Sequence, residues 1–96
     1  IEETLADMAH VLGERQAVGG LRLGELLREM DGRDPIERVT LLGLCTDICV
    51  IANAMLVKAF LPEVPVAVDA ACCAGATPEG HRRALDAMAA CQIEIL

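Results

Sequence analysis

Basic side chains are scarce in this sequence. Lys and Arg total 8 against 15 Asp and Glu, so the formal net charge is -7. Binding to a nucleic-acid phosphate backbone needs a clustered basic face. The only close basic pair is Arg82-Arg83, which we expect on a solvated helix face. Nucleic acid is therefore not an expected partner.

Long apolar runs are also missing. Asp47, Asn53 and Lys58 interrupt the most apolar region, and no run reaches the roughly 18 residues of a membrane helix. No signal peptide is visible, so we expect no membrane partner and a cytoplasmic protein. The chain starts at Ile1 rather than Met, and we expect that end to be a cut end.

The five cysteines do not form metal-binding motifs. There is no CxxC pair and no His at zinc-finger spacing, so we expect no metal and no other cofactor. An odd number of cysteines in apolar surroundings is typical of reduced cytosolic thiols. We expect three of them to be small core residues: Cys72, Cys73 and Cys91.

Apolar residues are abundant for a chain of this size. They make up 54% of the 96 residues, although only one is aromatic. A chain this short forms one small domain, here residues 1–96, and buries only a modest share of its surface. The surplus predicts faces that meet a neighbour.

The region around Cys49 organises the chain. Residues 39–45 are rich in Val, Leu and Thr, which predicts a strand buried on both faces, and Gly43 allows a sharp turn into an apolar helix over residues 47–60. Cys49 then lies near a helix N-terminus, where the dipole favours a thiolate. Open α/β sheets place their sites at such carboxyl strand ends. The pattern indicates nucleophilic catalysis.

The remaining segments predict alternating strands and helices. Strands separated by helices favour right-handed crossovers, a parallel sheet and helices on both faces. Asp69 falls at the end of one strand, where it could accept hydrogen bonds from loop amides. The expected elements are a helix tail over 1–8, a short strand over 10–12, a loop over 13–20, a helix through Leu23 and Met30 ending at 31–35, a strand over 66–68, a loop over 70–76, a helix capped by Thr77, and an edge strand over 92–96.

Three segments together carry a family resemblance. GLCTDICV at 43–50, VAVDA at 66–70 and TPEGHRRALDAM at 77–88 resemble the C-terminal half of the nicotinamidase-related cysteine hydrolases of the isochorismatase-like superfamily. The resemblance implies a Rossmann-like, three-layer αβα sandwich, present as its C-terminal portion. It also implies that Cys49 attacks a small carboxamide such as nicotinamide and passes through a thioester.

The resemblance assigns further roles. It implies an oxyanion hole formed by the backbone amides of Cys45 and Cys49, and a cis peptide between Leu44 and Cys45. The family's catalytic lysine position falls on Arg15, a replacement that keeps the charge but stays protonated. A plain solvated arginine is the alternative. The family's base aspartate and the metal cluster of some relatives have no match here, so we predict that the 96-residue chain alone is inactive.

Several alternatives remain open. Cys49 could be inert packing in an apolar helix, and His81 could be a base or a packed, hydrogen-bonded histidine. Asp47 opposes thiol ionisation, so we expect it to face away from Cys49. The competing function is a non-catalytic truncated homologue that oligomerises or acts as an interaction module. The expected partners are thus a small amide and either another copy or a missing N-terminal half. A third reading is a redox protein with a Cys45-Cys49 bridge.

Overall fold

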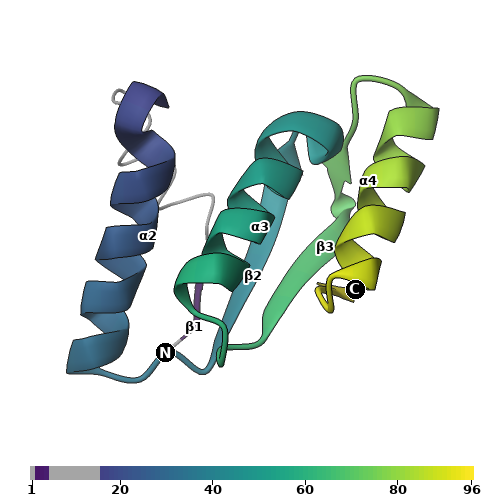
Figure 1. Ribbon diagram of the computed structural model, residues 1–96. Coiled ribbons are helices and arrows are strands. Elements are labelled where there is room, and N and C mark those ends of the chain that lie inside the picture. Colours follow the sequence, from purple (N-terminus) through teal and green to yellow (C-terminus); the bar gives the residue numbers. More distant parts are fainter. Residues whose placement is uncertain (1, 5–15) are drawn as a thin grey trace.

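The computed structural model describes residues 2–4 and 16–96, and these form an α/β arrangement (Figure 1). The α/β fold class is confirmed. The elements in chain order are β1 (Glu2–Thr4), α2 (Gln16–Arg33), β2 (Arg38–Leu44), the π-helical turn η2 (Thr46–Val50), α3 (Ile51–Phe60), β3 (Val66–Ala74), α4 (Pro78–Ala90) and β4 (Glu94–Ile95).

The four described strands form one parallel sheet in the order β1-β2-β3-β4. Each strand pairs with the next along the chain, so every crossover moves in the same direction. Right-handed crossovers of this kind place their helices on one face. Figure 1 shows α2, α3 and α4 side by side over that face, and neighbouring helices contact each other. We expected helices on both faces; within residues 16–96 they cover one.

A single apolar core lies between the helices and the sheet. Val39 and Leu41 of β2 and Val66 and Val68 of β3 alternate with residues of the other face, and all four are buried. The helices complete the core with Leu23, Leu27, Ala54, Val57, Ala84 and Met88. This packing holds β2 in place against α3 and α4, and it thereby positions the turn that joins β2 to α3.

The N-terminal part differs from the prediction. Residues 16–20 belong to α2 and not to a loop, because Leu23 and Leu27 bury one side of this helix and packing outweighs the low helix propensity of Gly19 and Gly20. Residues 2–4 form a strand beside β2 rather than a helix tail. The expected strand over 10–12 and Arg15 lie outside the described residues.

Strand β3 is longer than predicted. Residues 70–74 belong to it, where a loop was expected, because the end of β2 supplies pairing partners for Cys73 and Ala74. The pairing is interrupted: Leu41 is opposite Val68 but Gly43 is opposite Cys73, so β3 carries three extra residues there. Asp69 therefore ends the first regular stretch of pairing, although it does not end the strand.

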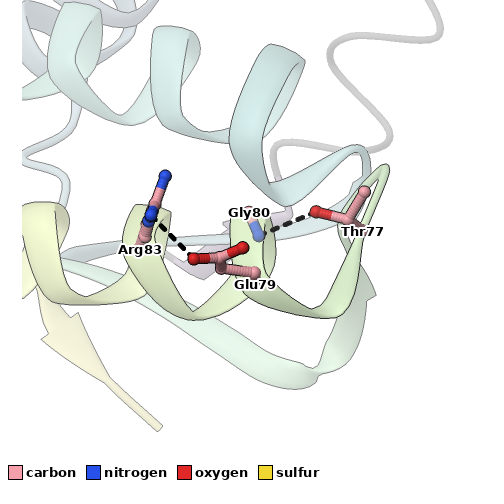
Figure 2. A network of polar contacts seen from close by, with 4 residues as sticks. All are labelled: Thr77, Glu79, Gly80 and Arg83. Carbon is pink, nitrogen blue, oxygen red and sulfur yellow. Dashed lines mark hydrogen bonds and ion pairs between the residues drawn. The ribbon is translucent and has the colours of Figure 1, made fainter.

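The C-terminal elements agree with the prediction. Thr77 caps α4, its side chain accepting a hydrogen bond from the Gly80 amide at 2.9 Å, and Pro78 occupies the first turn. Figure 2 shows this cap beside the Arg83–Glu79 ion pair at 2.7 Å. β4 follows as an edge strand of the sheet. No helix in the described part of the chain is long and apolar enough to cross a bilayer.

Candidate active site

The chain reverses at the carboxyl end of β2, in what we call the Cys49 turn, residues 43–50. Gly43 has φ 127°, which a side chain would strain, and the Leu44-Cys45 peptide bond is cis, as the resemblance implies. The predicted helix over 47–60 begins as the wider π turn η2, and α3 follows. The Cys45 carbonyl accepts hydrogen bonds from Ile48 at 3.1 Å and Val50 at 3.0 Å. π turns frequently occur at functional sites.

Cys49 is exposed within this turn. The alternative of inert packing in an apolar helix required a buried side chain, and the structure does not place it there. The Asn53 side-chain amide donates to the Cys49 carbonyl at 2.8 Å, one helical turn later. That contact ties the Cys49 backbone to the start of α3 and leaves the thiol accessible.

Thr46, at the start of η2, is completely buried. Its Oγ1 lies 2.7 Å from Nδ1 of His81, in the first turns of α4. His81 is half-buried, so the structure favours the packed, hydrogen-bonded histidine over a free general base. The contact joins the Cys49 turn to a helix that starts more than thirty residues later.

Asp47 faces the amino end of α4, a contact that the sequence analysis did not predict. Its Oδ1 accepts a hydrogen bond from the Ala76 amide at 3.0 Å, and its other carboxylate oxygen lies against Gly80. The amino end of a helix attracts negative charge. The Asp47 carboxylate therefore connects η2 to the amino end of α4.

A second group of thiols lies near the interruption in β3. Cys72 donates a hydrogen bond to Asp69, and that bond together with the Asp69 charge raises the pKa of Cys72 above its usual value. Burial chiefly raises the pKa of Cys73, which packs beside the core. Thiolates form less readily at both positions. The expectation of small core residues was wrong for Cys72 and Cys91, which are exposed.

Two large apolar side chains of the Cys49 turn are exposed. Leu44 is 70% exposed and Ile48 is 56% exposed. Sequence reasoning counted both as part of the strand and helix and missed their exposure. The available signal was the surplus of apolar residues in a small chain, which required some of them to face outward.

Three further expectations concern Arg15, a metal site and a Cys45-Cys49 bridge. Arg15 lies outside the described residues. Within residues 2–4 and 16–96, no group of three or more His, Cys, Asp or Glu side chains could hold a metal ion. All five cysteines are free thiols, so Cys45 and Cys49 are not bridged.

Comparison with known proteins places the chain in a family. A sequence model of the Isochorismatase domain matches residues 14–96, which includes the Cys49 turn, β3 and α4. No curated protein and no solved structure gives a significant match. With most of its length matched, the chain belongs to the Isochorismatase domain family, a hydrolase-type family.

Proposed function

We propose that this protein is an amidohydrolase of the nicotinamidase type, with Cys49 as the nucleophile. Its substrate is a small uncharged carboxamide, and its products are the acid and ammonia. One observation carries the proposal: the Cys49 side chain is exposed in a turn at the carboxyl end of a parallel strand. Membership of a hydrolase-type family supports it.

The reaction has two steps. The Cys49 thiolate attacks the amide carbon, a C–S bond forms, and the C–N bond breaks as the nitrogen takes up the proton lost from the thiol and leaves as ammonia. Water then attacks the thioester, releasing the acid and returning the thiol. Such covalent catalysis divides one difficult step into two easier ones.

The negative charge on the tetrahedral intermediate needs fixed donors. We assign this role to the backbone amides of Cys45 and Cys49. Removing one such donor in other enzymes costs about 2.7–4 kcal/mol. Arg15, at the family's lysine position, would add a permanent positive charge but no proton acceptor.

The surroundings of Cys49 favour an apolar substrate. Leu44 and Ile48 present exposed aliphatic surface on the same turn as the thiol. Such surface suits a flat, uncharged ring such as the pyridine of nicotinamide, because burying apolar area contributes binding energy and a charged group would lose hydration.

Turnover also needs a base. Among the described residues, His81 contacts the Cys49 turn and Asp47 lies within it, and both are already engaged: His81 Nδ1 by Thr46, and Asp47 by the Ala76 amide. We therefore expect the 96-residue chain to be acylated but not to turn over nicotinamide.

Acylation with an activated ester tests the nucleophile separately from the base. p-Nitrophenyl nicotinate loses a stable phenolate, so its leaving group needs no proton. We expect mass spectrometry to find one nicotinoyl group, on Cys49. The Cys49→Ala variant should lose it, whereas Cys91→Ala, which removes another exposed thiol, should keep it. Equal labelling of Cys49 and Cys91 would contradict the proposal. Ammonia release from nicotinamide that requires Cys49 would contradict only the expected inactivity.

A second candidate is an interaction module without catalysis. It is favoured by the exposed side chains of Leu44, Ile48 and Leu96, the last of which is 49% exposed beside the edge strand β4. Exposed strand edges and apolar surface both promote association. Light scattering over a concentration series distinguishes the two: a folded oligomer without Cys49 acylation supports the module.

A further inference from the structure

We propose that Thr46 and Asp47 are positioning residues, which fasten the Cys49 turn to the amino end of α4 and thereby orient the thiol toward the carbonyl it attacks. This inference rests on the proposed function, because it concerns how Cys49 is presented and not which reaction follows. Neither side chain takes part in forming or breaking the bonds of the substrate.

The first observation is that two successive residues contact the amino end of α4 and the loop residue just before it. Thr46 Oγ1 contacts His81 Nδ1 at 2.7 Å, and Asp47 Oδ1 accepts from the Ala76 amide at 3.0 Å. Two contacts from neighbouring residues restrict rotation as well as translation of the turn. Cys49 follows within the same π-helical turn, so its direction depends on them.

The second observation is that the amino end of α4 is closely packed. A Cβ at Gly80 would collide with the Asp47 carboxylate, and a Cβ at Gly75 would lie 2.8 Å from the His81 amide nitrogen. The Thr77 carbonyl accepts from that same amide at 3.0 Å, and the Thr77 side chain caps Gly80 (Figure 2). The Cys49 turn therefore contacts a helix end that is itself held by hydrogen bonds and close packing.

The physical reason for such bracing lies in acyl transfer. Attack on a carbonyl requires the sulfur and the oxyanion donors to be aligned, and a misplacement of about 1 Å can lower the rate about 100-fold. Alkylation by iodoacetamide needs an exposed and ionised thiol, but no alignment with oxyanion donors. Loss of the two contacts should therefore slow acylation and leave alkylation nearly unchanged.

The test compares both reactions at Cys49 by peptide mass spectrometry. For Asp47→Ala, we expect the acylation rate at saturating p-nitrophenyl nicotinate to fall by about 10- to 100-fold, while the half-saturating ester concentration and the iodoacetamide rate change by less than about threefold. Asp47→Asn should recover most of the acylation rate, because an amide oxygen can still accept from Ala76. Asp86→Ala, which removes an exposed carboxylate elsewhere on α4, is the matched control.

Two further variants keep the test decisive if Asp47→Ala does not fold. Gly80→Ala should slow acylation by displacing the Asp47 carboxylate, and Thr46→Ser should retain acylation better than Thr46→Val. Normal acylation in Asp47→Ala and Gly80→Ala overturns the positioning role alone. A parent chain that is alkylated but never acylated at Cys49 overturns the proposed function, and this inference with it.

Discussion

Thr46 and His81, 35 residues apart in the sequence, are joined by a 2.7 Å contact between Oγ1 and Nδ1. The threonine begins the turn that presents Cys49, and the histidine lies in α4 behind it. Both residues lie within the segment that matches the Isochorismatase domain, so this tertiary contact belongs to the family-matched part of the chain.

Replacing Thr46 with Val should destabilise the protein. The variant keeps the shape of the side chain but leaves His81 Nδ1 without its partner, at a cost of about 1–3 kcal/mol. Urea unfolding followed by circular dichroism measures it. Thr40→Val is the matched control, because the buried Thr40 hydroxyl has no hydrogen-bond partner among the described residues and its loss should cost little. Equal effects in the two variants would show that the Thr46 contact contributes nothing.

Removing the Thr77 cap should weaken α4. In Thr77→Ala the Gly80 amide loses its side-chain acceptor, and the free energy of unfolding should fall by about 0.5–2 kcal/mol. Thr77→Ser keeps an acceptor oxygen and should stay close to the parent. The same urea titration compares both, and a loss in Thr77→Ser as large as in Thr77→Ala would argue against the cap.

Met88 should be among the most sensitive core positions. It is fully buried between α4 and the sheet, so Met88→Ala should lower the free energy of unfolding by about 2–5 kcal/mol. Arg82→Ala, at an exposed position of the same helix, should change it by less than about 0.5 kcal/mol. Thermal unfolding of the two variants provides the measurement. If Met88→Ala were as stable as Arg82→Ala, α4 would not pack as described.

Asp69 should control the reactivity of Cys72. Its hydrogen bond and charge raise the pKa of Cys72, so thiolate forms at a higher pH than usual. Asp69→Ala should move the pH profile of Cys72 alkylation to lower pH, and at pH 8 Cys72 should react faster. Asp69→Asn, which loses the charge but can still accept a hydrogen bond, should give a smaller shift. Cys91, exposed in the same chain, is the internal reference. An unchanged Cys72 profile in Asp69→Ala would contradict this assignment.

Local sequence signals were reliable where neighbours along the chain decide the structure. Thr77 and Pro78 marked the start of α4 because a helix cap depends on residues within one turn. The apolar run ending at Gly43 located β2 and the following turn, because a buried strand requires apolar residues and a positive φ favours glycine. The same local signals place Cys49 just after this turn.

Tertiary structure decided what depends on distant partners. Residues 70–74 became a strand because β2 offers them hydrogen bonds, although small residues there favoured a loop. Asp47 turned to the amino end of α4 because the Ala76 amide donates a hydrogen bond to its carboxylate, and Leu44 and Ile48 became exposed because their turn leaves the core. From β2 onward, the sequence by itself determined the order of the elements, and it singled out Cys49 as the candidate nucleophile. The contacts between the Cys49 turn and the amino end of α4 depended on the tertiary structure, because no local pattern encodes which distant helix end lies beside a turn.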